Sequence, residues 1–274
     1  MINLFNYIER KSPVHELTGA TKLLVLIFWM AAAMLTYDTR LLVFLSVLSL
    51  VLFRFSNIRL KDVSFMLAFT AVFLLMNNVL IYLFSPQHGK EIYGSATVLF
   101  GKGKYALTQE QLFYHLNLVL KYLATIPIVI LFVSTTNPSE FAASLNRIHV
   151  PYSIAYSVAL ALRYIPDIQR EYVEISQAQQ ARGIEMSKKQ RLGKRLKAAS
   201  AILVPLILSS MDRIEVISNA MELRGFGKNK KRSWYMERRF TPADYSSIAL
   251  SVLLLAAALV LNHINGGRFW NPFI

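Results

Sequence analysis

The sequence predicts an all-α polytopic membrane protein with about five transmembrane helices and further amphipathic helices on the cytoplasmic side. Of its 274 residues, 54% are hydrophobic and 17% are charged, and the mean hydropathy is +0.40. A soluble domain is nearer a quarter charged. Apolar runs that approach the length of a bilayer crossing recur along the chain, and between residues 134 and 240 shorter apolar runs alternate with charged residues. This composition is typical of a membrane protein with a sizeable polar part.

The apolar runs give the expected spans. The first follows a polar stretch and no small-residue cleavage site follows it, so it is expected to be a retained helix and not a signal peptide. The second is short for a hydrocarbon core of about 30 Å and needs its flanking residues to cross. The fourth carries Lys121 and Pro127. The expected spans cover residues 23–35, 41–55, 63–84, 112–133 and 245–261.

Basic residues predict the orientation. Residues 1–22, 54–62 and 134–243 together hold 24 of the 30 lysines and arginines. Cytoplasmic segments of membrane proteins carry such an excess, so the N-terminus and the region 134–243 are expected to be cytoplasmic. The expected organisation is therefore a membrane part over 1–133 with four spans, a cytoplasmic helical region over 134–240, and a last span with its tail over 241–274.

A repeated motif marks this cytoplasmic region. Each copy follows the pattern Ala-x-(Gln/Glu)-x-Arg-Gly and closes a stretch with the apolar spacing of one helix face. Glycine ends helices readily, and a basic residue is favourable in the last turn. A single Arg-Gly pair is common at the end of a helix, but two copies that share further positions indicate a function. The copies are Ala178-Gln179-Gln180-Ala181-Arg182-Gly183 and Ala220-Met221-Glu222-Leu223-Arg224-Gly225, in which Gln179 and Met221 stand at the variable second position.

These motifs resemble a known family. Over nearly its full length, the chain resembles the transmembrane T component of energy-coupling factor (ECF) transporters, a group that includes cobalt and vitamin importers. The paired motifs are the most specific mark, although alanine is more usual where this chain has Leu223. The N-terminal signature of the family is similar to the stretch Ser12-Pro13-Val14-His15-Glu16-Leu17, which Thr21-Lys22-Leu23-Leu24 follows.

The resemblance implies partners and a role. Each Arg-Gly end would dock into one of two ABC ATPase subunits, through Ala181, Arg182 and Gly183 and through Leu223, Arg224 and Gly225, with the other motif residues in support. The chain would also bind a membrane-embedded S component that captures a vitamin or metal ion. The resemblance places the complex in the cell membrane of a prokaryote. ATP would be bound by the ATPases and not by this chain, which implies that this chain is not an enzyme.

The residues themselves agree with a chain that has no catalytic or cofactor site. No Walker A loop is present to hold phosphates, there are no cysteines, and the five histidines show no metal-ligand spacing. The net charge of +14 is attributed to cytoplasmic loops beside the lipid bilayer and not to nucleic acid, because no aromatic and basic binding platform accompanies it.

Two other functions are weighed against this one. An ordinary ABC permease subunit forms the transport pathway itself, but it would normally present one coupling helix and not two. A membrane-embedded transferase would need paired acidic motifs or a His–Asp set near the membrane boundary, which the sequence lacks. The sequence leaves the transported substrate open.

Three local expectations can be compared with a structure. Asn77 and Asn78, inside the third apolar run, are expected to contact a neighbouring helix, with substrate contact as the alternative. Glu171 and Arg213 are expected to be solvated or paired within their own helices. The turn-rich loop 85–111 is expected to form a small hairpin from residues 92–93 and 97–100.

Overall fold

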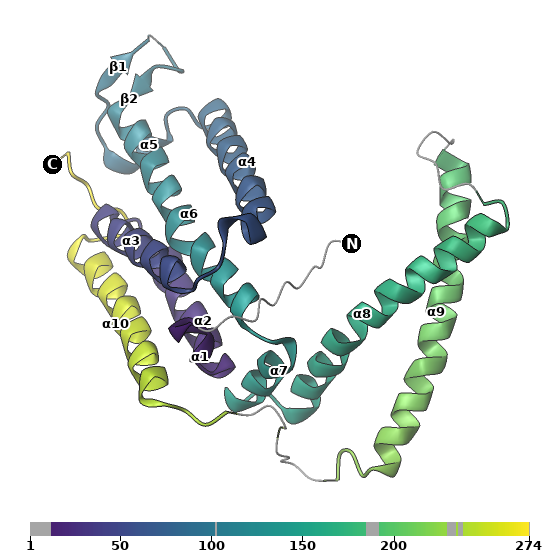
Figure 1. The fold of residues 1–274 in the computed structure, drawn as a ribbon. Helices are drawn as coiled ribbons and strands as arrows, with labels where there is room; N and C mark the ends of the chain where they lie inside the picture. Colours follow the sequence, from purple (N-terminus) through teal and green to yellow (C-terminus); the bar gives the residue numbers. More distant parts are fainter. Residues whose placement is uncertain (1–11, 102, 185–191, 229–233, 235–237, 274) are drawn as a thin grey trace. The chain divides into compact units, whose positions relative to one another are not determined.

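A computed structural model gives the fold, and it describes residues 12–101, 103–184, 192–228, 234 and 238–273. The chain separates into two compact units (Figure 1). The first unit combines Met1–Asn137 with Arg238–Ile274, and the second is Pro138–Glu237. A basic stretch of the sequence covers residues 187–197, and its residues 187–191 lie outside the described residues.

The described part of the first unit consists mainly of helices. Its elements, in chain order, are α1 Pro13–Glu16, α2 Gly19–Leu35, α3 Thr39–Phe55, α4 Leu60–Phe84, α5 His88–Tyr93, β1 Val98–Phe100, β2 Leu107–Thr108, α6 Gln109–Thr135 and α10 Pro242–Ile264. The second unit contains α7 Pro138–Arg147, α8 Tyr152–Ala181 and α9 Leu192–Leu223.

The expected fold class, an all-α polytopic membrane protein, is confirmed. Among the described residues, α4, α6 and α10 are long and apolar enough to cross a membrane, and α2 is a shorter apolar helix. Helices α2 and α3 have 17 residues each, which is about 25 Å of rise. The second apolar run is therefore as short as expected. A total of five spans stays a prediction, because α2 and α3 need their flanks to cross.

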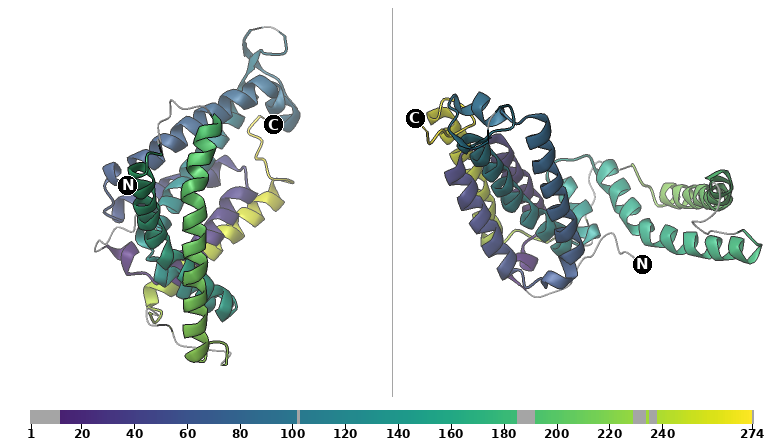
Figure 2. Two further views of the ribbon diagram at one scale, coloured as in Figure 1. Left: turned by 90° about the vertical axis from the view of Figure 1, so that its right-hand side faces the viewer. Right: turned by 90° about the horizontal axis from the view of Figure 1, so that it is seen from above.

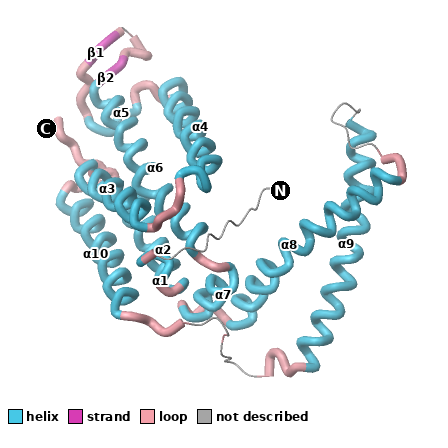
Figure 3. The backbone as a smooth tube through the Cα atoms, in the orientation of Figure 1, coloured by secondary structure: helices cyan, strands magenta, loops and turns pink. Residues whose placement is uncertain are grey.

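The strands differ from the expectation for loop 85–111. Ile92 and Tyr93 lie in the short helix α5, and β1 pairs instead with β2 in an antiparallel hairpin (Figure 3). Gly94 ends α5 with a φ of +73°, a conformation that glycine adopts without a Cβ penalty. A helix stop at this glycine explains why the segment before it does not continue into a strand.

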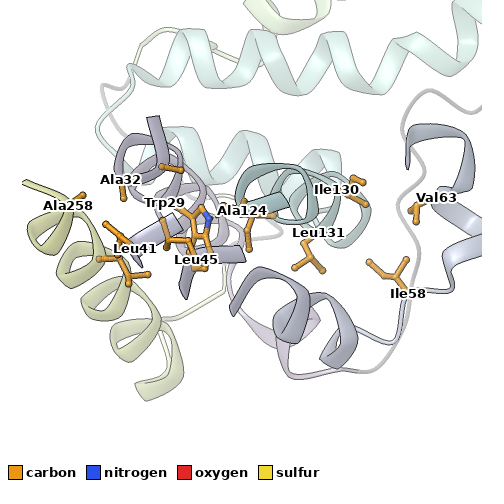
Figure 4. Close-up of a cluster of buried hydrophobic side chains, with 13 residues drawn as sticks. Trp29, Ala32, Leu41, Leu45, Ile58, Val63, Ala124, Ile130, Leu131 and Ala258 are labelled. Atoms are coloured by element: carbon orange, nitrogen blue, oxygen red, sulfur yellow. Dashed lines mark hydrogen bonds between the residues drawn. The ribbon is translucent and has the colours of Figure 1, made fainter. Parts of the chain in front are cut away.

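The core of the first unit forms around α6, which packs against α2, α3, α4 and α5. Trp29 is fully buried against α6 and its indole Nε1 donates to the carbonyl of Ala124 at 2.8 Å (Figure 4). Small residues let the helices approach closely. Ser46 and Ser49 of α3 donate to backbone carbonyls of α6, those of Leu120 at 2.9 Å and Leu123 at 2.8 Å. These two serines therefore tie α3 closely to α6.

The amides of the third span behave as expected in part. Asn78 Oδ1 accepts from Nδ1 of His115 on α6 at 2.8 Å, and His115 Nε2 accepts from Gln111 Nε2 at 3.1 Å. One neutral imidazole tautomer satisfies both bonds. The expected helix-packing contact is therefore confirmed for Asn78, which joins α4 to α6.

Acid is expected to weaken the turn between α2 and α3. Asp38 is fully buried there and accepts from Arg40 Nη2 at 2.7 Å and from Asn265 Nδ2 at 2.9 Å. Burial alone would raise the pKa of Asp38, but these donors outweigh burial and hold the pKa below its usual value of 3.8. The stabilisation is complete at neutral pH and is lost as the pH falls below 3.8 through the folded-state pKa. Thermal unfolding in detergent from about pH 6 to about pH 3 measures this loss, and Asp38→Asn should lack it. Equal acid sensitivity of the two proteins would contradict the assignment.

Candidate functional site

The first Arg-Gly motif closes α8 with a complete hydrogen-bonded cap. Arg182 is the C-cap residue and Gly183 follows with a φ of +85°. The Gly183 N–H donates to the carbonyl of Gln180 at 2.9 Å, and the Ile184 N–H donates to that of Gln179 at 3.0 Å. This pair of bonds is the Schellman motif, which requires the left-handed conformation at the glycine. The cap therefore explains why glycine occupies position 183 of the motif.

The second motif closes α9 in the same way. Arg224 follows the last helical residue, and Gly225 has a φ of +68°. The Gly225 N–H donates to the carbonyl of Glu222 at 2.8 Å, and the Phe226 N–H donates to that of Met221 at 2.9 Å. The two copies therefore agree in backbone geometry as well as in sequence. In each copy the arginine directly follows the last residue of its helix, Ala181 in α8 and Leu223 in α9.

Most motif residues are exposed on the second unit. Ala181, Arg182 and Gly183 are exposed at the first end, as are Leu223 and Arg224 at the second, while Gly225 is half-buried. Of the supporting residues, Ala178, Ala220 and Glu222 are exposed and Met221 is half-buried. Gln179 is buried, and its Nε2 donates to the carbonyl of Ala201 on α9 at 3.1 Å. Gln179 therefore joins the two helices, which is a structural role.

The structure places the two Arg-Gly ends far apart. Helices α8 and α9 run in opposite directions within the second unit, as Figure 1 shows, and Figure 2 gives two further views of the pair. The second end lies beside the start of α8, where the ring of Phe226 is 4.8 Å from that of Tyr156. The 26 residues from Tyr156 to Arg182 correspond to about 39 Å of helix. The two arginines thus stand at opposite ends of one helix pair and cannot enter one small groove together.

A partly buried ion pair joins α8 and α9 near the middle of this helix pair. Arg213 Nη2 of α9 lies 2.6 Å from Glu171 Oε2 of α8, and the Ser209 hydroxyl also donates to Glu171. The expectation that Glu171 and Arg213 are solvated or paired within their own helices is therefore wrong. Antiparallel packing brings these positions together, which helix periodicity alone does not reveal.

A double-mutant cycle should detect this ion pair. Glu171→Ala, Arg213→Ala and the double variant are expected to give a coupling free energy of about 1 kcal/mol in thermal unfolding. The expected coupling free energy is small because Arg213 is partly exposed and solvent screens the charges. The neighbouring pair Arg170–Asp167 spans 3.7 Å on an exposed surface, and its cycle should give close to zero. Equal coupling free energies in the two cycles would show that the Glu171–Arg213 ion pair does not hold the two helices together.

Four aromatic residues fix the second Arg-Gly end, and the sequence reasoning missed them. Besides the Phe226–Tyr156 contact, the rings of Tyr152 and Trp234 are 5.4 Å apart, and Trp234 Nε1 donates to Asn146 Oδ1 at 3.2 Å. The available signals were the tyrosines four residues apart and the phenylalanine that directly follows Gly225. The segment after α9 is thereby held against α7 and α8.

Phe226→Ala should loosen the second end without removing its charge. Loss of a half-buried aromatic contact is expected to cost about 2 kcal/mol locally. Hydrogen exchange of the amides of residues 221–228 should accelerate, while those of residues 178–184 should not change. Phe226→Leu keeps much of the apolar area and serves as the matched control. Unchanged exchange in the alanine variant would show that the aromatic cluster does not hold this end.

A groove lies between the two helices where they diverge. It has a volume of about 850 Å³ and is lined largely by apolar side chains, among them Leu160, Ile168, Ile214, Ile217 and Phe226. Several more apolar residues of α9 are exposed, including Ile207, Leu208, Met211 and Val216. Exposed apolar area of this extent on a helix pair is typical of a contact surface. Across the described residues, no group of three or more potential metal ligands occurs.

Comparison with known proteins settles the family. Residues 10–234 match the model of the cobalt transport protein family, CbiQ. The chain belongs to this family. It is 27% identical to the energy-coupling factor transporter transmembrane protein EcfT of Exiguobacterium sibiricum, over 96% of each chain. The proteins of the same name from Bacillus selenitireducens and Bacillus subtilis are 30% and 28% identical, over 93% and 92% of this chain and 94% and 95% of their own. The resemblance to ECF transporter T components is thereby confirmed across nearly the whole chain.

Proposed function

We propose that this protein is the energy-coupling transmembrane subunit of an ECF-type importer, which links two ABC ATPase subunits to a substrate-binding S component. The observation that carries the proposal is the pair of matching Arg-Gly ends, each exposed and about 40 Å from the other along α8. Two equivalent ends so far apart suit two related subunits. The family is named for cobalt transport, and the resemblance to ECF transporters adds vitamins, so the imported substrate would be a metal ion or a vitamin.

Docking of the ATPases through Arg182 and Arg224 follows from side-chain chemistry. A guanidinium is always charged, and it forms bidentate bonds to a carboxylate in a partner's groove. The rigid cap behind each arginine limits the conformational entropy that docking would cost. The two helices that lead to the caps have 30 and 32 residues, each with one internal proline, and the Glu171–Arg213 pair keeps them together. Force applied at one end would then reach the other helix.

The S component would bind the apolar surface of the helix pair. The groove between α8 and α9 and the exposed apolar side chains of α9 offer a contact suited to an amphipathic or membrane-embedded partner. In this arrangement residues 1–133 and 241–274 form the membrane part, residues 134–240 are cytoplasmic, and the N-terminus is inside. The chain would bind no ATP and catalyse no reaction itself.

Purification of the intact complex tests this proposal. The tagged chain, expressed from its own genomic neighbourhood and extracted in a mild detergent, should co-purify with two ATPase subunits and one small hydrophobic subunit. Mass spectrometry of the purified complex gives the stoichiometry. A complex of two copies of this chain with two ATPases and no further membrane subunit would indicate an ordinary permease. Turnover of a prenyl or acyl donor by the chain alone would indicate a transferase.

A further inference from the structure

The hairpin of β1 and β2 displays apolar side chains that no helix of the first unit buries. Val98, Leu99 and Phe100 are all exposed, and Phe100 is 81% exposed. Tyr105, just before β2, is also exposed. A strand with three apolar residues in water is unfavourable and prone to associate with other surfaces. The apolar strand therefore indicates a surface that water does not cover in the working protein.

The base of this hairpin is firmly held by a buried carboxylate. Glu110, at the start of α6, accepts from the Thr97 N–H at 3.0 Å, from the Thr97 hydroxyl at 3.1 Å and from the Ser95 hydroxyl at 3.0 Å. The Gln109 N–H donates to the carbonyl of Thr97 at 3.0 Å. Charge-assisted bonds of this kind are strong. These hydrogen bonds fix the base of the hairpin, and the apolar side chains of β1 stay exposed.

The hairpin is continuous with the lipid-facing side of α4. The Tyr82 hydroxyl, near the end of α4, donates to the carbonyl of Tyr105 at 2.7 Å, and the two rings are 6.5 Å apart. The last residues of α4, Leu83 and Phe84, are exposed, as are apolar residues along the whole helix. Helix α4 is long and apolar enough to span a membrane, which would place these side chains against lipid. Tyrosines collect at the boundary between lipid and water.

Charge on the same loop suits the boundary as well. Lys104 is exposed in the connection between β1 and β2. Lysine side chains can lay their methylene groups along an apolar surface and leave the ammonium among headgroups. Exposed aromatic, aliphatic and basic residues side by side are the composition of segments that lie in the interface plane.

We propose that β1 and Tyr105 insert into the boundary between headgroups and acyl chains beside the end of α4, so that the hairpin anchors this end of the first unit in the lipid. Burial of Leu99 and Phe100 in this layer removes their apolar area from water. The proposal does not depend on what the Arg-Gly ends bind, because it concerns the loop between α4 and α6 alone.

Single-cysteine labelling tests the hairpin directly, since the chain has no cysteine of its own. Phe100→Cys, labelled with an environment-sensitive fluorophore, is reconstituted without partner proteins into phosphatidylcholine–phosphatidylglycerol vesicles. Phe84→Cys serves as the lipid reference and Lys90→Cys as the aqueous reference. Iodide on both sides of the membrane reports water access, and lipids with a nitroxide near the headgroup report membrane contact. Leu99→Cys provides a second position if the first label disturbs folding.

We expect the Phe100 and Leu99 labels to follow the Phe84 label, with a loss of iodide quenching and a gain of quenching by nitroxide lipid relative to Lys90. Iodide quenching equal to that of Lys90 in these vesicles would overturn the proposal. Protection that appears only when an ATPase or S component is added would overturn it too, and would show that a protein covers the hairpin.

Discussion

Replacement of Arg182 and Arg224 together by alanine is expected to abolish both the association with ATPase subunits and the uptake of substrate. Each arginine follows a rigidly capped helix end, and each would lose a bidentate, charge-assisted contact that the methyl group of alanine cannot replace. Loss of one such contact in a partner's groove typically costs about 2–5 kcal/mol, or at least roughly thirtyfold in affinity. Co-purification and uptake of labelled substrate in the same cells measure the effect.

The design of this experiment separates docking from folding. Arg170→Ala removes an exposed arginine from the same helix, α8, and is expected to leave both readouts unchanged. Arg182→Lys and Arg224→Lys keep the charge but lose the fork geometry, and should fall between wild type and the alanine variants. Full uptake by the double alanine variant at normal expression would contradict the proposed function.

Asp244→Ala is expected to lower the free energy of unfolding by about 3 kcal/mol or more, because it leaves donors unsatisfied in a fully buried site. Its carboxylate accepts four hydrogen bonds, from the N–H and hydroxyl groups of both Thr18 and Thr241. Thr18 caps α2, and Thr241 forms a capping box with Asp244 at the start of α10. One side chain therefore holds the first and last apolar helices of the chain together.

Thermal unfolding in detergent, followed by size-exclusion chromatography, measures this effect. Asp244→Asn retains the volume but turns one acceptor into a donor, so it should be destabilised to a smaller degree. Glu91→Ala removes an exposed carboxylate from the same unit and serves as the control, with an expected change within about 0.5 kcal/mol. A midpoint for Asp244→Ala equal to that of Glu91→Ala would show that the shared carboxylate adds nothing to stability.

Local patterns in the sequence predicted the helices and their ends well. Apolar runs located all five expected spans within helices of the described chain, and the Arg-Gly motifs marked the ends of α8 and α9. These features depend on residues close together in the chain, such as a glycine that adopts a left-handed conformation one residue after a cap.

Contacts between distant residues were the ones missed. The partner of Glu171 is 42 residues away, and Trp234 bonds to Asn146 across 88 residues. Helix periodicity shows which face of α8 is apolar, but it does not show which residue of α9 faces Glu171. The hairpin was misplaced for a related reason, since the pairing of β1 with β2 depends on where α5 ends and on the support from Glu110.

Under the proposed docking of the second Arg-Gly end, Leu223 would bear on which ATPases can serve this protein. At 89% exposure the side chain has almost no contact with its own chain, so the leucine at this motif position is nearly neutral for the fold. A docked subunit would have to receive it in an apolar recess, where full burial of a leucine is worth about 1.5–3 kcal/mol. A subunit shaped for alanine would meet three extra carbons at the rim of its cleft. Leu223 would thus favour binding of the cognate ATPase subunit and disfavour binding of ATPases from other transport systems.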